Sequence, residues 1–285
     1  MPLIQRFPCN SKGRDFVIGD LHGCLPLLQQ LLNHVQFDPA LDRVFSTGDL
    51  IDRGPDSAGC LELLKQDWFH TVMGNHELML IRYLESVSHD SQSDETLTAL
   101  EHLLINGGDW ILLYEKRAGQ TLANWLLALK RLPMLINVGS AAAPDRFHVT
   151  HGDLLLQRGR MLSDDLIDAL EKTEDSETNR LIFDGLPASV VMDRSVWSRR
   201  LFKHPGHYET MRYLKRLSLV YVGHTMIAKP RLLASHLFID GGAFLAGRAE
   251  EQAGHGLNLI DHQRRIRYWT NGRELVASPL PELNP

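Results

Sequence analysis

The strongest constraint on this sequence is a pattern that occurs six times, in which a short run of β-branched or aromatic residues ends at a glycine beside a polar residue. The six segments are "DFVIGD" (15–20), "RVFSTGD" (43–49), "HTVMGN" (70–75), "FHVTHGD" (147–153), "LVYVGHT" (219–225) and "LFIDGG" (237–242). Each pattern predicts a buried strand that enters a tight loop. Helix-period stretches separate the first three segments, which favours an α/β fold with a parallel sheet.

Four stretches have the apolar period of a helix, and they lie at 25–35, 77–87, 96–104 and 121–132. No internal repeat or Gly/Ser-rich linker divides the sequence, so we expect one main domain at 15–262. A mostly helical insertion would occupy 77–140 of that domain. An N-terminal extension at 1–14 and a C-terminal strand or tail at 263–285 would flank it.

Charge and cysteine content argue against several classes of protein. The chain has 30 basic and 35 acidic residues and a formal net charge of −5, without the basic stripe of a nucleic-acid-binding surface. No run approaches the ~18 apolar residues that a membrane helix requires, and the first residues lack a signal peptide's long apolar stretch. The cysteines, Cys9, Cys24 and Cys60, have no C-x-x-C spacing. We therefore expect a cytoplasmic protein with free thiols and no nucleic-acid or membrane partner; the oligomeric state stays open.

Side chains of types that can bind metals or phosphate follow five of the six predicted strands. They are Asp20 and His22 in "GDLHGC", Asp49, Asp52 and Arg53 in "GDLIDRGPDS", Asn75 and His76 in "GNHE", His151 in "HGD" and His224 in "GHT". Ligands in open α/β sheets bind at loops that leave the carboxyl ends of strands, so we expect these side chains to converge. Each motif alone is typical of an ordinary turn, and the prediction therefore rests on the ordered set.

The set combines carboxylate, amide and imidazole groups and is too large for one tetrahedral ion. It suits two borderline divalent metals such as manganese, iron or zinc, with Asp49 on the middle loop placed to bridge them. The lack of thiolates argues against a closed structural zinc site. Two metals about 3.5–4 Å apart serve in-line displacement at phosphorus. A histidine can protonate the departing group, and arginine suits the phosphoryl oxygens.

The ordered motifs "GDxHG", "GDxxDRG", "GNHE", "HGD" and "GHT" resemble those of the calcineurin-like metallophosphoesterases. Arg53 and "GNHE" are similar to the serine/threonine phosphoprotein phosphatase branch, which includes the bacteriophage lambda protein phosphatase and its bacterial relatives. The segments "LINGGDW" (104–110), "VWSR" (196–199), "GHTMIAKP" (223–230) and "FIDGGAFLAG" (238–247) resemble that group in the same order. The resemblance covers about residues 15–260 and implies a β-sandwich of two mixed sheets flanked by helices, with the site at one sheet edge.

The resemblance implies a dinuclear centre whose ligands divide into two sets. One ion takes Asp20, His22 and Asp49; the other takes Asp49 as a bridge with Asn75, His151 and His224. Manganese is the activating ion by resemblance, with iron or zinc as alternatives. A hydroxide that bridges the metals would attack phosphorus in line, with inversion and without a phosphoenzyme.

The remaining assignments concern proton transfer and phosphate binding. His76 becomes the general acid and Asp52 its carboxylate partner. Arg53 and Arg199 bind the phosphate, with Asn75 beside it. The alignment through "VWSR" selects Arg199 from three neighbouring arginines. The predicted activity is hydrolysis of phosphoserine or phosphothreonine in proteins or peptides, with phosphotyrosine or phosphohistidine as further substrates, in a bacterial signalling context.

Two other functions are alternatives to this prediction. The relative that hydrolyses diadenosine tetraphosphate symmetrically shares most of these motifs, as would a broader small-molecule phosphoesterase. Glu77 favours the protein phosphatase, because the dinucleotide hydrolase typically carries Asp at that position of "GNHE". A metal-binding scaffold with a dead site would lack a ligand, and none is missing. The "IDGGA" segment (239–243) departs from the family pattern at Gly242 and receives no role.

Overall fold

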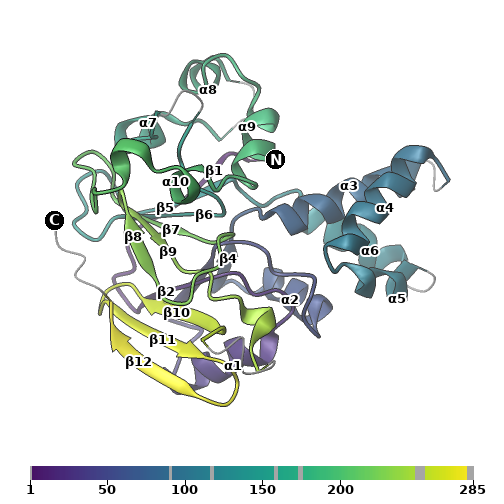
Figure 1. The fold of residues 1–285 in the computed structure, drawn as a ribbon, viewed down its shortest axis with the longest axis horizontal. Helices are drawn as coiled ribbons and strands as arrows, with labels where there is room; N and C mark the ends of the chain where they lie inside the picture. Colours follow the sequence, from purple (N-terminus) through teal and green to yellow (C-terminus); the bar gives the residue numbers. More distant parts are fainter. Residues whose placement is uncertain are drawn as a thin grey trace.

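Two six-stranded sheets pack face to face in the computed structural model, which describes residues 2–89, 92–115, 119–156, 160–172, 176–247 and 254–280 (Figure 1). The first sheet has the order β1-β5-β6-β7-β9-β8, formed by β1 (Ile4–Phe7), β5 (Leu135–Val138), β6 (Phe147–Thr150), β7 (Leu219–Val222), β8 (Arg231–Leu233) and β9 (His236–Phe238). The second has the order β12-β11-β10-β2-β3-β4, formed by β2 (Asp15–Ile18), β3 (Arg43–Ser46), β4 (Phe69–Thr71), β10 (Leu257–Asp261), β11 (Ile266–Thr270) and β12 (Leu275–Pro279).

Each sheet contains one set of three parallel strands. In the first sheet β6, β7 and β9 run parallel, whereas β5 is antiparallel to β6 and β8 is antiparallel to β9. In the second sheet β2, β3 and β4 run parallel, and β10, β11 and β12 extend it in antiparallel fashion. The parallel sheet expected from the first 75 residues is confirmed, as is the fold of two mixed sheets.

Alternate residues of the strands form the core between the sheets. Val17, Phe45, Phe147 and Tyr221 belong to this buried cluster. The rings of Phe45 and Phe147 meet edge to face, with centroids 5.6 Å apart. Residues on the opposite faces of the strands pack against helices, so both faces of each parallel set are covered. That arrangement explains why these strands read as nearly continuous apolar runs.

Helices flank the sandwich and also form an arm beside it (Figure 1). Besides α1 (Leu25–His34), the helices are α2 (Ser57–Glu62), α3 (Asn75–His89), α4 (Asp94–Ile105), α5 (Leu112–Glu115), α6 (Gly119–Leu129), α7 (Asp164–Ala169), α8 (Glu177–Ile182), α9 (Ala188–Ser195) and α10 (Arg200–Lys203). α1 packs on the second sheet, where it contacts β10 and β11. α3, α4, α5 and α6 form the arm, which projects away from the sheets. None of the helices in the described part of the chain is long and apolar enough to cross a bilayer.

The six predicted strands and four predicted helices are all present, with shifted ends. The most informative shift is at α3, which begins at Asn75 instead of Glu77. The segments set apart at the ends of the sequence also supply strands: β1 pairs with β5, and β11 and β12 extend the second sheet. Residues 281–285 of the expected tail lie outside the described residues.

His262 is buried between the sheets in a form that disfavours protonation. Its Nε2 lies 3.2 Å from the Asp145 carbonyl oxygen, so Nε2–H donates and Nδ1 accepts from the Tyr221 hydroxyl at 2.9 Å. The Arg265 guanidinium lies 3.2 Å from the same Nδ1. Burial, aided by the charge of Arg265, lowers the pKa of His262 to about 3.

Acidification should therefore destabilise the fold, and His262 should contribute to the slope. An unfolded histidine has a pKa of about 6.5, so the unfolded state binds the extra proton between that pH and the lower folded pKa, and stability falls as pH drops. We expect the melting temperature of His262→Gln to depend less steeply on pH than that of the wild type between pH 7 and 5. The matched variant His34→Gln, at the exposed end of α1, should keep the wild-type slope. Equal slopes for His262→Gln and the wild type would contradict this account.

Candidate metal centre

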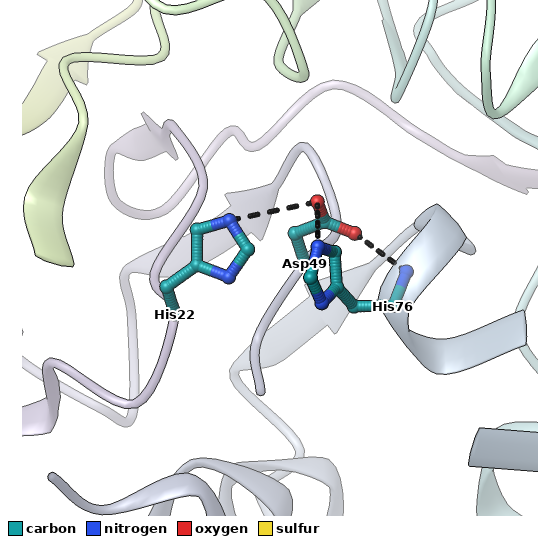
Figure 2. A group of neighbouring side chains, drawn as sticks. All are labelled: His22, Asp49 and His76. Carbon is teal, nitrogen blue, oxygen red and sulfur yellow. Dashed lines mark hydrogen bonds and ion pairs between the residues drawn. The ribbon is translucent and has the colours of Figure 1, made fainter. Parts of the chain in front are cut away.

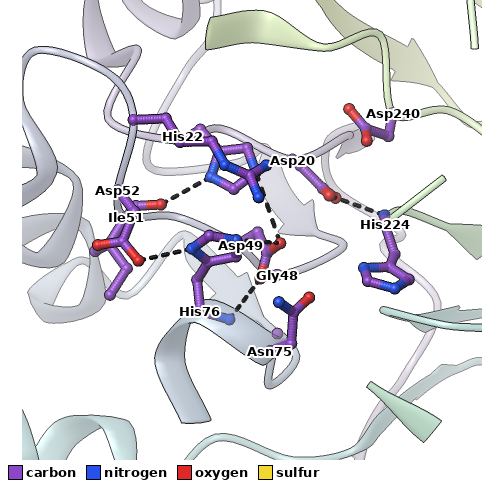
Figure 3. Close-up of polar contacts among 12 residues, drawn as sticks. Asp20, His22, Gly48, Asp49, Ile51, Asp52, Asn75, His76, His224 and Asp240 are labelled. Carbon is purple, nitrogen blue, oxygen red and sulfur yellow. Dashed lines mark hydrogen bonds and ion pairs between the residues drawn. The ribbon is translucent and has the colours of Figure 1, made fainter. Parts of the chain in front are cut away.

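The carboxyl ends of the two parallel strand sets meet at one edge of the sandwich and bring the candidate residues together. The second sheet supplies Asp20 and His22 after β2, Asp49, Asp52 and Arg53 after β3, and Asn75 and His76 after β4. The first sheet supplies His151 after β6 and His224 after β7. Figure 3 shows side chains from both sheets pointing toward a shared space. The site is thus built across the sandwich and belongs to neither sheet alone.

Asp49 lies at the centre of this space. Its Oδ2 is 3.6 Å from His22 Nε2, 3.8 Å from His76 Nε2 and 3.4 Å from His151 Nε2. Figure 2 shows the first two imidazoles converging on this carboxylate. Burial acts to raise the pKa of Asp49, but the positive charges that His151, His76 and His22 carry when protonated outweigh it and hold the pKa below its usual value. Asp49 is therefore ionised and faces nitrogen donors from both sheets.

Two groups of side chains in the described part of the chain have the spacing of metal ligands, and Asp49 belongs to both. One group is His22, Asp49 and His76; the other is Asp49, His151 and His224. Within each group the ligand atoms all lie within 4.8 Å of one another. A carboxylate shared by two ligand groups is the arrangement that a bridged pair of ions requires.

Hydrogen bonds hold two of the candidate ligand histidines in the form that could bind a metal. His22 Nδ1 lies 2.8 Å from the Ile51 carbonyl oxygen and His151 Nδ1 lies 2.7 Å from that of Thr47. Each Nδ1–H therefore donates to a carbonyl, and each Nε2 presents a lone pair to the site. Burial lowers the pKa of both rings and lowers that of His224 to about 2, which keeps them neutral.

Two buried nitrogens provide a direct test of whether this donor set fits a metal. Nε2 of His76 and Nε2 of His224 are buried and have no hydrogen-bond partner among the described residues. Buried polar atoms are nearly always paired in native proteins. The unpaired nitrogen of His224, a ring that burial keeps neutral, fits a site for divalent cations with nitrogen and oxygen ligands. The unpaired nitrogen of His76 belongs to a ring with a raised pKa and fits a proton donor that faces the same space.

Asp20 and Asn75 lie at the site but outside both ligand groups. Asp20 Oδ1 accepts from the Thr47 hydroxyl at 2.9 Å, and its Oδ2 accepts from the His224 backbone at 2.8 Å. Burial, followed by the charges of Asp240 and Asp49, raises the pKa of Asp20. Asn75 Oδ1 lies 2.9 Å from His151 Nε2. Both residues therefore reach the space around Asp49, and Asp20 also ties the two sheets together.

His76 and Asp52 form a buried pair next to Asp49. His76 Nδ1 lies 2.6 Å from Asp52 Oδ2, and the Trp110 indole donates to Asp52 Oδ1 at 2.7 Å. Burial acts to lower the pKa of His76, but Asp49 and Asp52 outweigh it and raise the pKa. The pair thus directs Nε2 of a histidine that favours its protonated form into the site. Trp110, in "LINGGDW", fixes the carboxylate that orients this ring.

The two candidate phosphate-binding arginines lie at different parts of the site. Arg53 is exposed, with one guanidinium nitrogen 2.7 Å from His22 Nε2 and its centre 4.8 Å above the Phe244 ring. Arg199 donates to the His224 backbone oxygen at 3.0 Å. Its neighbour Arg200 instead donates to the Leu156 backbone oxygen. Of these adjacent arginines, Arg199 is the one that contacts a candidate ligand residue.

Backbone strain is concentrated in the loops that carry these side chains. His22, Asp49, Asp52, Arg53 and His224 have positive φ angles between 43° and 73°. Such angles are uncommon for residues other than glycine, and they persist where the surrounding structure enforces them, often at active sites. The strain turns consecutive side chains toward the same space.

Neighbouring glycines leave room for the carboxylates. A Cβ at Gly74 would overlap Oδ1 of Asp49, and a Cβ at Gly223 would overlap Oδ1 of Asp20. Both positions therefore require glycine, for close approach of the backbone to a ligand side chain.

Glu77 holds the backbone of the loop that carries Asp49 and of the start of α3. Its Oε2 accepts from the backbone N–H groups of Asp49 at 2.9 Å and Gly74 at 3.0 Å, and its Oε1 accepts from that of Leu50 at 2.8 Å. The Gly74 bond is the glutamate half of a capping box at the start of α3. Burial, followed by the charge of Asp49, raises the pKa of Glu77 to about 8, although its backbone bonds act in the opposite direction. Glu77 therefore holds the Asp49 loop and is fully buried.

Asp240 is a site residue that sequence reasoning missed. It follows β9, is buried, and lies beside Asp20 and His224 in Figure 3. Its Oδ1 accepts from the Gly242 backbone at 2.8 Å. Burial chiefly raises its pKa, to about 6, and the charge of Asp49 acts in the same direction. The signal was present in "FIDGG", where an aspartate follows a predicted strand as in the other motifs.

Replacing Glu77 with glutamine should weaken both the fold and the metal centre. The amide would place a donor opposite backbone donors, which costs about 1–3 kcal/mol of unfolding free energy. Loosening the Asp49 loop should lower metal affinity by about 10–100-fold. Urea unfolding in a chelator and calorimetric metal titration would measure the two effects.

The control for this prediction is Glu62→Gln, which removes an exposed carboxylate that pairs with Lys65. It should change neither the unfolding free energy nor the metal affinity. Wild-type stability and affinity in Glu77→Gln would rule out the supporting role.

Comparisons with known proteins agree with this chemistry. A segment of 137 residues is 40% identical to serine/threonine-protein phosphatase 1 of Salmonella typhimurium, covering 48% of this chain and 58% of that protein. Serine/threonine-protein phosphatase 2 of the same organism is 27% identical over 234 residues, covering 81% of this chain and 88% of that protein. A symmetrical bis(5'-nucleosyl)-tetraphosphatase of Actinobacillus pleuropneumoniae is 34% identical over 146 residues, covering 50% of this chain and 44% of that protein.

Solved structures share the fold. A putative diadenosine tetraphosphatase has a TM-score of 0.50 at 22% identity, covering 98% of this chain and 99% of that one. A cold-active protein-tyrosine phosphatase from a Shewanella species has a TM-score of 0.52 at 17% identity, covering 96% and 83%. The family model for calcineurin-like phosphoesterases matches residues 16–228. The chain therefore belongs to the calcineurin-like phosphoesterase family.

Proposed function

We propose that this protein is a metal-dependent phosphomonoesterase that acts on phosphoserine and phosphothreonine in proteins or peptides. Its family hydrolyses phosphoric esters with divalent metal ions. The observation that carries the proposal is the position of Asp49, which has metal-ligand spacing with His22 on one side and with His151 and His224 on the other. His76, which also lies beside Asp49, pairs with Asp52. The proposal includes a cytoplasmic role in bacterial signalling, which is consistent with the three free cysteines.

The proposed ligands divide between two ions that share Asp49. Asp20 and His22 complete the first set; Asn75, His151 and His224 complete the second. Two divalent cations, when bound, would supply Lewis-acid stabilisation of phosphoryl charge and a water nucleophile at neutral pH. We favour manganese, with iron or zinc as alternatives, because carboxylate, amide and imidazole donors suit borderline ions.

His76 is the proposed general acid. Asp52 holds Nδ1 at 2.6 Å, so Nε2 is the atom directed at the departing oxygen. A raised pKa means that His76 keeps its proton until it is needed for donation. Trp110 prevents Asp52 from rotating, which preserves the ring orientation.

Arg53 and Arg199 are proposed to bind the phosphoryl oxygens. Their planar guanidinium groups match a phosphate geometrically. Arg53 is exposed at the edge of the site, whereas Arg199 is half-buried beside His224. Asn75, whose Oδ1 lies 2.9 Å from His151 Nε2, is proposed to contact the phosphate as well as a metal.

The substrate class is the finer part of the proposal. Serine/threonine-protein phosphatases match this chain at 40% identity over 137 residues and 35% over 138, and symmetrical bis(5'-nucleosyl)-tetraphosphatases match it at 41% over 87 residues and 34% over 146. We favour the first group because one of its members matches over 81% of this chain. A second candidate is symmetrical hydrolysis of diadenosine tetraphosphate, because relatives described as such hydrolases also match this chain. Their matches cover half of the chain or less. The buried position of Glu77 removes it as a substrate contact, so the difference between "GNHE" and "GNHD" does not decide the substrate through direct recognition.

Removal of the proposed acid should matter most for poor leaving groups. His76→Asn should lower kcat on a phosphoserine peptide by about 10²–10⁴-fold. The loss on p-nitrophenyl phosphate should be much smaller, because p-nitrophenolate departs without protonation. His34→Asn serves as a control on the far end of α1 and should leave both rates unchanged. Equal losses on both substrates in His76→Asn would contradict the acid role.

Substrate class can be tested with purified protein supplied with manganese. We expect higher kcat/KM on phosphoserine and phosphothreonine peptides than on diadenosine tetraphosphate, and loss of both activities on chelation. Metal analysis of protein purified without added metal would identify the native ions. A far higher kcat/KM on the dinucleotide would replace the first proposal with the second. Activity that survives complete metal removal would contradict both.

A further inference from the structure

Two hollows flank Arg53 on the surface beside the metal centre. The large hollow has a volume of about 630 Å³, and its apolar lining includes Leu27, Trp110, Leu113 and Phe244. The small hollow has a volume of about 330 Å³, and its lining is Arg53, Ile105, Asn106, Gly107 and Phe244. Nothing in the proposed chemistry of phosphate hydrolysis uses either hollow.

Arg53 and Phe244 line both hollows, so the two hollows adjoin each other at these side chains. The guanidinium lies 4.8 Å above the Phe244 ring, and the Arg53 backbone donates to the Gly107 oxygen at 2.9 Å. These contacts connect the arginine to the loop after β9 on one side and to the α4–α5 connection on the other. A group bound to Arg53 thus lies next to both hollows.

The arm leaves apolar side chains exposed at these hollows. Leu113 is 76% exposed in the large hollow, and Ile105 is 75% exposed in the small one. A single exposed leucine is ordinary. Two such residues beside a candidate phosphate-binding arginine, together with the partly exposed Trp110 and Phe244, form an apolar surface continuous with the site.

The charges in the hollows distinguish between the two substrate classes. Among the described residues that line them, Arg53 is the only cation and Asp109 the only carboxylate. The further phosphates of a dinucleoside tetraphosphate would call for additional cationic partners. Apolar peptide side chains require none, and they would cover Leu113 and Ile105.

We infer that the two hollows bind apolar side chains that precede and follow the phosphorylated residue of an extended peptide. The large hollow takes a bulky side chain against Trp110 and Leu113, and the small hollow takes a smaller one against Ile105. This inference rests on the proposed phosphatase function and makes it more specific: the preferred substrate is a phosphopeptide with apolar neighbours on both sides.

A peptide panel tests the inference. Two phosphothreonine peptides of equal charge would differ only in the adjoining residues, leucine in one and serine in the other. We expect kcat/KM to be about 10-fold higher for the leucine peptide, since pocket contacts of this size discriminate by that order. Leu113→Ser should remove most of this preference by raising KM at unchanged kcat. Its rate on p-nitrophenyl phosphate, which lacks flanking residues, should not change.

The matched control is Leu127→Ser, which alters a leucine on the same arm that is 58% exposed and lines neither hollow. It should keep the leucine preference. Equal kcat/KM for the two peptides, or equal effects of the two variants, would overturn the inference while leaving phosphopeptide hydrolysis in place. Failure to hydrolyse either peptide would overturn the proposed function as well. If Leu113→Ser weakened hydrolysis of diadenosine tetraphosphate and left the peptides unaffected, the hollows would serve a nucleoside.

Discussion

The buried carboxylate of Glu77 is the interaction on which the centre of the site depends. It accepts three backbone hydrogen bonds, two from the loop that carries Asp49 and one from Gly74 at the start of α3. Gly74 has no side chain to cap the helix, and Asp49 Oδ1 supplies that cap by accepting from the His76 backbone at 3.0 Å. The same aspartate therefore caps the start of α3 and faces the histidines that surround the shared space. A local folding requirement and the chemistry of the site are met by one residue.

The candidate site was largely visible in the sequence because its residues follow a repeated rule. Apart from Arg199, which precedes α10, each lies in the loop or at the helix start that follows a buried strand, and parallel strands place such positions at one edge. Asp240 obeys the same rule but was passed over, because its segment departed from the expected family pattern. Its position after β9 is the signal in the sequence that identifies it.

The contacts that hold the candidate site residues in place could not be predicted from the sequence by the same rule. Trp110 reaches Asp52 across 58 positions of sequence, and Glu77 reaches Asp49 across 28. Neither residue carries a periodic or spacing signal for its partner. The sandwich itself was anticipated through family resemblance, whereas the strand pattern alone predicted only parallel α/β units. What remained hidden was how β10, β11 and β12 extend those units in antiparallel order.

The site lies across two sheets, so the distances between its side chains depend on how the hydrophobic core packs. His22 and Asp49 belong to one sheet, and His151 belongs to the other. Their separation follows from how closely the sheets pack, which is governed by pairs such as Phe45 and Phe147. Interiors are packed tightly enough to transmit a change of one methylene group. Bound ions would in turn cross-link the two sheets, as a ligand that binds only the native state stabilises it. Substitutions deep in the sandwich can therefore tune metal affinity without touching any ligand.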